Sequence, residues 1–219
     1  MVTGPIGLLA DLHGNLPALE AVLDELKRRD VTRIFVAGDL LLGGEQPVEV
    51  FKRLNQVGAE CVRGASDAAL ATLSETKIGA AMARDPEKAE RFKKTRAALG
   101  ELVIKYLGRL PDSLRIPLSD GREIVLVHGS PADPLTEITH DMSDDEILAL
   151  IADDPADIIA CGGSHVPFQR DVDELRVLGL GSVGASPEGG VAHFAIVTPR
   201  MEGTIIEQAW VRYAGEEPG

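Results

Sequence analysis

The chain lacks any apolar run long enough to cross a lipid bilayer, and its N-terminus has no basic residues followed by an apolar stretch. We therefore expect a cytoplasmic protein with no membrane partner.

Basic residues are fewer than acidic ones: the chain has 22 Lys and Arg and 35 Asp and Glu, a formal net charge of −13 at pH 7. This disfavours nucleic acid as a partner, because binding to a phosphate backbone relies on excess positive charge. A phosphate-bearing substrate is not excluded, since bound metal ions can supply positive charge locally.

Cysteine is rare as well. Cys61 and Cys161 each close an apolar, strand-like run, so we expect two buried, reduced thiols. No internal repeat and no low-complexity linker interrupts the chain. Its 219 residues, 44% hydrophobic and 26% charged, are typical of a globular protein. We therefore predict a single domain over residues 1–219.

The first third of the chain alternates between strand and helix patterns. This alternation predicts a parallel sheet with right-handed crossovers. Asn15 is placed to cap the first helix. The expected strands are residues 6–10, 31–37 and 59–63, and the expected helices are 16–26 and 47–56.

Residues from about 66 to 107 are rich in helix formers and contain no strand-like run. Phe92, Leu99, Leu102, Val103 and Tyr106 lie at helical spacing. This helical insertion has two open interpretations, a cap over a cleft and a packed helical layer.

The remainder of the chain returns to strand patterns. We expect a pair of strands within 114–127 and a helix opened by a capping box from Ser143 to Glu146. The last sixty residues contain short strands broken by Gly and Pro, which suggests a second, mixed or antiparallel sheet.

Four of the apolar runs end in residues that can bind a metal ion. Asp11 and His13 follow the run 6–10, Asp39 follows 34–37, His128 follows 124–127, and His165 follows 158–160. A single Asp-x-His triplet is a weak signal of a metal site. Metal-binding residues at the ends of four separate apolar runs are a stronger one. Strand ends converge at one edge of a sheet, so we expect these side chains to share one cleft. Mixed carboxylate and imidazole ligands suit Mn, Fe, Zn or Ni better than Ca.

These motifs, in this order, resemble the calcineurin-like metallophosphoesterase family, and the similarity covers nearly the whole chain. It is strongest to a bacterial phosphodiesterase and phosphatase branch. Its opening Asp-x-His-Gly-Asn-Leu-Pro-Ala-Leu-Glu-Ala-Val is present from 11 to 22, its His-Gly-Ser-Pro at 128–131, and its Gly-Ser-Val-Gly at 181–184. The resemblance implies an α/β fold, a four-layer β-sandwich of two sheets flanked by helices. It also implies two divalent metals that act on a phosphate ester.

The resemblance assigns Asp11, His13 and His165 to the first metal and Asp39 to a bridge between the metals. All four are present, so we expect one tightly bound divalent cation. His128 would be a ligand of the second metal and a weak one, and the open alternative is a structural histidine with its hydrogen bonds satisfied.

The second site departs from the family pattern in three places. Ala65 replaces an Asn ligand, Gly163 replaces a His ligand, and Ser66 replaces the His that would act as the acid. The family identifies no other catalytic residue here, because a Ser hydroxyl cannot act as an acid near pH 7. We therefore expect a second metal site that is weak or empty.

Four further residues have less specific expectations. Arg63 is a candidate substrate contact, with a surface salt bridge as the alternative. Asp67 is expected to be a carboxylate at a helix N-terminus. His140 is expected at the surface and His193 in the core.

Three functional interpretations stay open, and whether the protein is an enzyme is one of the open points. The first is a metal-dependent phosphoesterase with weak or altered activity, acting on a phosphate-containing small molecule or a phosphoprotein. The second is an inactive pseudoenzyme scaffold that binds a protein partner or a nucleotide. The third is a metal-dependent sensor of a phosphate-bearing ligand. Substrate identity does not follow from the fold.

Overall fold

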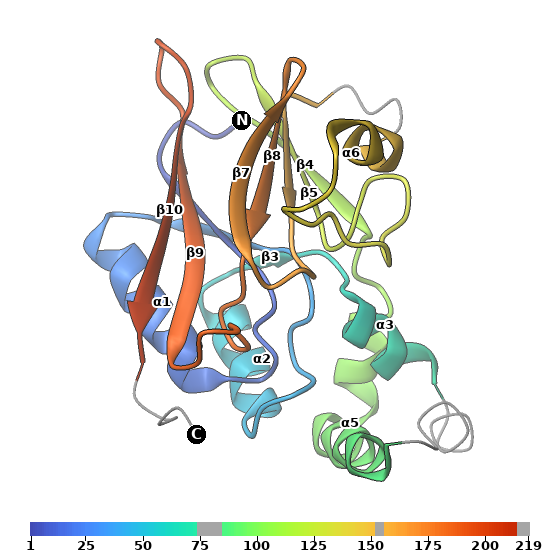
Figure 1. Ribbon diagram of the computed structural model, residues 1–219. Coiled ribbons are helices and arrows are strands. Elements are labelled where there is room, and N and C mark those ends of the chain that lie inside the picture. Colours follow the sequence, from blue (N-terminus) through green and yellow to red (C-terminus); the bar gives the residue numbers. More distant parts are fainter. Residues whose placement is uncertain (74–84, 152–155, 214–219) are drawn as a thin grey trace.

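The computed structural model describes residues 1–73, 85–151 and 156–213, and two five-stranded sheets form its centre (Figure 1). The strands are β1 (Ile6–Leu9), β2 (Arg33–Val36), β3 (Glu60–Cys61), β4 (Ser113–Pro117), β5 (Glu123–Val127), β6 (Ile158–Cys161), β7 (Pro167–Val172), β8 (Leu175–Leu180), β9 (Val191–Thr198) and β10 (Ile205–Arg212). The helices are α1 (Leu16–Arg28), α2 (Pro47–Gln56), α3 (Ala65–Thr72), α5 (Pro86–Leu107) and α6 (Asp144–Ile151).

The first sheet has the order β10-β9-β1-β2-β3 and the second β4-β5-β6-β8-β7. The strands β1, β2 and β3 are parallel, as the alternating pattern predicted. In the second sheet β5, β6 and β8 are parallel, while β4 and β7 pair antiparallel at its two edges. The predicted α/β fold of two sheets flanked by helices is confirmed.

Three apolar clusters separate the layers. One packs α1 and α2 against the outer face of the first sheet and extends to α5, which lies against α2 and α3. A second fills the space between the sheets, and a third packs α6 against the outer face of the second sheet. Successive residues of a strand face opposite sides, so Leu8 lies between the sheets and Leu9 faces the helices. None of the helices in the described ranges has the length and apolar character that a membrane span needs.

The predicted capping interactions are present at the starts of two helices. The Asn15 side chain accepts a hydrogen bond from Ala18 N at 3.1 Å. At α6, Glu146 Oε2 accepts from Ser143 N at 2.8 Å, and Ser143 Oγ accepts from Glu146 N at 3.3 Å, which is the predicted capping box.

The expectation for the last sixty residues is wrong in part. The strands β7 and β8 belong to the mixed second sheet, but β9 and β10 return to the first sheet, where β9 pairs antiparallel with β1. This pairing satisfies the backbone polar groups along the edge of β1 that β2 leaves open. The strand β9 is buried along almost its whole length, as expected of a strand with neighbours on both sides.

The helical insertion differs from the expected helix at Leu102 and Gly100. Leu102 is 83% exposed rather than inward, and Gly100 interrupts α5 with φ 70°. Residues 74–84 of the insertion lie outside the described residues. The third strand is also shorter than predicted, because Arg63 N donates to Pro111 O instead of continuing the ladder.

The turn after β8 is pressed against the loop that follows β1. Gly184 N donates to Asp11 O at 2.9 Å, and a Cβ at position 184 would lie 1.8 Å from Leu12 O. No side chain fits at that distance, so the backbone of one loop would have to move.

We expect Gly184→Ala to lower the free energy of unfolding by about 3 kcal/mol or more, at the upper end for an overpacked position. Urea unfolding measures the change. Gly4→Ala is the matched control, since its Cβ would meet nothing within 4 Å. Equal stability of the two variants would contradict this packing.

Candidate metal centre

The predicted convergence occurs where the two sheets meet. Asp11 and Asp39 follow β1 and β2 of the first sheet, and His128 and His165 follow β5 and β6 of the second. His165 Nε2 lies 3.1 Å from His13 Nε2 and 3.7 Å from Asp11 Oδ1. His13 Nε2 lies 4.0 Å from Asp39 Oδ2. His128 lies between the two carboxylates, with Nε2 3.5 Å from Asp39 Oδ1 and Nδ1 3.8 Å from Asp11 Oδ1. The predicted ligand residues are therefore neighbours.

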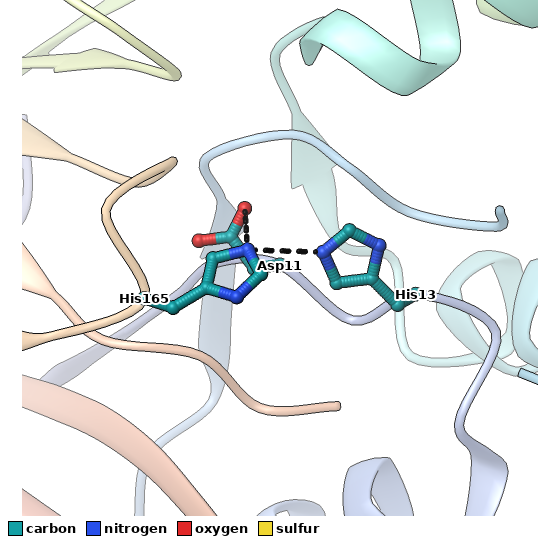
Figure 2. A group of neighbouring side chains, drawn as sticks. All are labelled: Asp11, His13 and His165. Carbon is teal, nitrogen blue, oxygen red and sulfur yellow. Dashed lines mark hydrogen bonds and ion pairs between the residues drawn. The ribbon is translucent and has the colours of Figure 1, made fainter. Parts of the chain in front are cut away.

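Backbone carbonyl groups fix the orientation of all three imidazoles. A carbonyl oxygen only accepts, so each Nδ1 must carry a proton and each Nε2 in a neutral ring must be unprotonated. The donors and acceptors are His13 Nδ1 to Leu42 O at 2.8 Å, His128 Nδ1 to Ala37 O at 2.8 Å, and His165 Nδ1 to Ala185 O at 3.0 Å. This arrangement presents the Nε2 lone pairs of His13 and His165 to one another beside the Asp11 carboxylate (Figure 2). Metal-binding histidines in proteins are commonly oriented in this way.

Asp11 is the most deeply buried carboxylate of the centre. Its Oδ2 accepts a hydrogen bond from Gly163 N at 3.0 Å, but its buried Oδ1 has no hydrogen-bond partner among the described residues. Burial, together with the charge of Asp39, raises the pKa of the Asp11 carboxyl well above its usual value. Burial and the neighbouring His13 lower the pKa of His165. Burial is the main cause of both shifts, because it disfavours the charged form of each group.

A divalent cation would stabilise this arrangement of nitrogen and oxygen atoms. Two unprotonated nitrogen atoms 3.1 Å apart repel each other unless a cation or a proton lies between them, and the unpaired Asp11 oxygen points to the same place. Two sets of groups can each hold one ion, Asp11 with His13 and His165, and Asp11 with Asp39 and His128. The donor set of carboxylate oxygen and imidazole nitrogen thus fits a divalent transition metal.

The backbone around the centre is strained in a consistent way. Asp11, His13, Asp39 and His165 all have positive φ, between 48° and 59°. Left-handed backbone at a residue other than Gly costs about 1–3 kcal/mol and clusters at functional sites. Four such residues in one centre indicate that the fold holds their side chains in place at the expense of stability.

The second half of the centre is as poor in ligands as the sequence indicated. Ala65 offers no ligand atom, and Gly163 has no side chain. Ser66 N donates to Asp39 Oδ1 at 2.8 Å, while the buried Ser66 Oγ has no hydrogen-bond partner among the described residues. The Ser66 hydroxyl is therefore a buried polar group without a hydrogen bond beside the centre.

Asp67 supports this region rather than lining it. Its fully buried carboxylate accepts hydrogen bonds from Gly64 N at 3.0 Å and Leu40 N at 3.1 Å, at the first turn of α3. Burial and the charge of Asp39 raise the pKa of Asp67 to about 7. The prediction of a carboxylate at a helix N-terminus is confirmed.

The other predicted residues lie apart from the centre. Arg63 forms an ion pair with Asp112 at 2.5 Å and donates to Gly108 O, and a contact between Arg63 and a substrate stays a prediction. His140 is exposed and His193 is buried, as expected. Cys61 and Cys161 are both free and buried.

The sequence did not indicate that four further residues lie near the centre. The charge of Glu137 raises the pKa of Asp11, and its Cγ lies 2.9 Å from where a Cβ at Gly163 would be. Lys88, Arg91 and Phe92 of α5 border a cavity that also reaches the metal ligands. In sequence Glu137 lies in a loop rich in Pro and Asp, while the two basic residues read as an ordinary solvent-facing helix surface.

Comparison with known proteins agrees with this geometry. The model of the calcineurin-like phosphoesterase superfamily domain matches residues 5–202. The chain belongs to this superfamily. The family implies a divalent metal cofactor, which the donor set described above fits.

Individual relatives are distant. An uncharacterized protein of Methanocaldococcus jannaschii is 26% identical over 212 residues, covering 86% of this chain and 80% of the relative. A hypothetical protein of Pyrococcus horikoshii has a similar structure, with a TM-score of 0.83, 25% identity, and 95% of this chain and 88% of that chain covered. A metallophosphoesterase of Sphaerobacter thermophilus gives a TM-score of 0.75 at 24% identity, over 95% and 89% of the two chains. At this last identity the similarity concerns the fold alone.

Proposed function

We propose that the protein is a phosphoesterase with one tight divalent-cation site and a weak second site, and that it hydrolyses phosphate esters whose leaving group needs no protonation. One observation carries this proposal. Three histidines with backbone-fixed Nδ1 protons surround two carboxylates, and one buried carboxylate oxygen accepts no hydrogen bond from the described residues. Manganese, iron, zinc and nickel all suit these donors. The buried free thiols favour a reducing compartment, and we propose the cytoplasm.

A bound cation would make water a nucleophile at neutral pH and neutralise charge on the phosphoryl oxygens. Asp11, His13, Asp39 and His165 would hold it. In the hydrolysis, water loses a proton to solvent and its oxygen forms a bond to phosphorus, while the ester P–O bond breaks with its electron pair left on the departing oxygen. Ser66 cannot protonate that oxygen near pH 7, so it leaves as an anion. Leaving groups of low basicity are therefore favoured.

The missing ligands also favour a second candidate function. Ala65, Ser66 and Gly163 remove two metal ligands and the acid, which is the pattern expected of a phosphate-ligand sensor or an inactive scaffold. Such a protein would bind phosphate esters in the same centre without turning them over.

Comparison of an aryl ester with an alkyl ester separates these functions. We expect the protein, stripped of metal and reloaded with Mn²⁺, to hydrolyse 4-nitrophenyl phosphate, and to hydrolyse glycerol phosphate at least about 100-fold more slowly, since help from a general acid contributes about 10²- to 10⁴-fold. Steady-state kinetics with each ester measures this ratio. Equal rates would mean that another group supplies the proton, and no hydrolysis of either ester would favour the sensor or the scaffold.

A further inference from the structure

A cavity of about 420 Å³ opens directly beside the metal centre. His13 and Asp39 form one wall, Ala65, Ser66 and Ala69 of α3 form another, and α5 closes the far side. The cavity touches the two positions, 65 and 66, at which the family pattern has larger side chains. Part of this space thus exists because those side chains are small. A phosphoryl group held at the metal centre would direct its leaving group toward it.

The far wall is held firmly by packing. Phe92 of α5 is fully buried, and Arg96 of α5 donates to Leu70 O of α3. Further along α5, the rings of Tyr106 and Phe51 of α2 meet edge to face with centroids 5.3 Å apart. A preformed cavity of this size, apolar on several sides, is of the kind that binds small organic ligands.

Two basic side chains stand where α5 borders the cavity. Lys88 and Arg91 are three residues apart on the helix and therefore lie on the same face. Both are exposed, and neither has an acidic partner among the described residues. Glu45, which lines an adjoining hollow, is paired with Lys94 at 3.8 Å. In a chain with a net charge of −13, two cations without an acidic partner among the described residues, on a cavity that also reaches the metal ligands, favour an anionic ligand.

We infer that this cavity binds the leaving group of the substrate, and that the leaving group is a nucleotide. The inference rests on the proposed function and extends its substrates from esters to a phosphoanhydride of a nucleoside, whose leaving group also needs no proton. The flat base would occupy the apolar part lined by Leu42 and Ala69, and the departing phosphate would meet Lys88 and Arg91. A phosphate leaves with its electron pair as an anion and needs no proton, so the absence of an acid at Ser66 costs nothing in this reaction.

Binding of AMP to the metal-free protein tests the cavity apart from the metal chemistry. We expect AMP to bind at least about 10-fold tighter than adenosine or inorganic phosphate, measured by isothermal titration calorimetry in EDTA. Lys88→Ala and Arg91→Ala should each weaken AMP binding by about 3- to 10-fold, the order for a partly exposed charged hydrogen bond. Lys93→Ala is the matched control, because it removes the same charge from α5 but borders a different hollow, and it should change nothing.

A second variant probes the apolar part of the cavity. Ala69→Phe should fill the space and reduce AMP binding by about 10-fold or more, with circular dichroism reporting whether the fold is kept. AMP binding that is no tighter than phosphate binding, or equal losses in the variants of Lys88, Arg91 and Lys93, would overturn the inference. If 4-nitrophenyl phosphate were still hydrolysed, the proposed function would stand without it. If AMP bound as expected but no ester were hydrolysed, the cavity would stand and the proposed function would fail.

Discussion

Asp11→Asn should abolish tight metal binding while making the metal-free protein more stable. The variant removes the carboxylate that belongs to both candidate ligand sets. Replacing even an outer-shell partner of a metal ligand typically costs 10- to 100-fold in affinity, so we expect loss of this ligand to cost more than about 100-fold for Mn²⁺. Without metal, Asp11 is a buried charge beside Asp39, and its removal relieves that repulsion. Calorimetric titration and thermal unfolding measure the two effects.

The same variant changes how stability depends on pH. The pKa values of Asp11 and Asp67 are raised in the fold, so the folded protein binds more protons than the unfolded chain above about pH 4. This contribution to stability is fully present below pH 4 and is lost as pH rises through the folded pKa values, for Asp67 about 7. Asp11→Asn should therefore flatten the fall in unfolding temperature of the metal-free protein above pH 4.

Asp24→Asn is the matched control for both effects, since Asp24 is exposed on α1. It should leave the metal affinity and the pH profile unchanged. Retention of Mn²⁺ at the wild-type level by Asp11→Asn would mean that the ion binds elsewhere.

The second large effect is expected when the family pattern is rebuilt. Ala65→Asn, Ser66→His and Gly163→His together should add a second bound cation and raise the rate on glycerol phosphate by about 10²- to 10⁴-fold, the usual contribution of a general acid. The structure adds one requirement. Position 163 has φ 77°, and its Cβ would lie 2.9 Å from Glu137 Cγ. Glu137 is exposed and can swing away, so its side chain is the part that must move.

A partial variant separates metal from acid. Ala65→Asn with Gly163→His, leaving Ser66 in place, should bind two cations per chain yet stay slow on the alkyl ester. Elemental analysis and kinetics together report the two properties. A full variant that binds two metals and remains inert would contradict the account, because the three departures would then not be the cause of low activity.

The sequence predicted most of the centre because strand ends can be read from it. Apolar runs mark the ends that carry Asp11, Asp39 and His128, and the structure places them together. The sequence did not reveal that β9 returns to pair with β1, since pairing between distant strands depends on tertiary packing. The sequence did not predict the histidine tautomers either, because their hydrogen-bond acceptors are backbone carbonyls, which any residue type provides.

The cavity beside the centre could not be predicted for a related reason. Lys88 and Arg91 follow the pattern of any solvent-facing helix surface. Only the packing of α5 against α3 and α2 places them at the border of a cavity that also reaches His13 and Asp39. Leu102 fits the helical spacing but points outward, because Gly100 interrupts α5 two residues earlier. Side-chain type alone does not specify the direction of a helix after such a break.

The position of a bound cation tests the central claim most directly. Crystals equilibrated with Mn²⁺ should give a strong anomalous difference peak among Asp11, His13, Asp39 and His165, with at most a weaker second peak beside His128. Wild-type protein that shows no peak at these side chains with saturating Mn²⁺, or a peak only elsewhere on the molecule, would contradict the account.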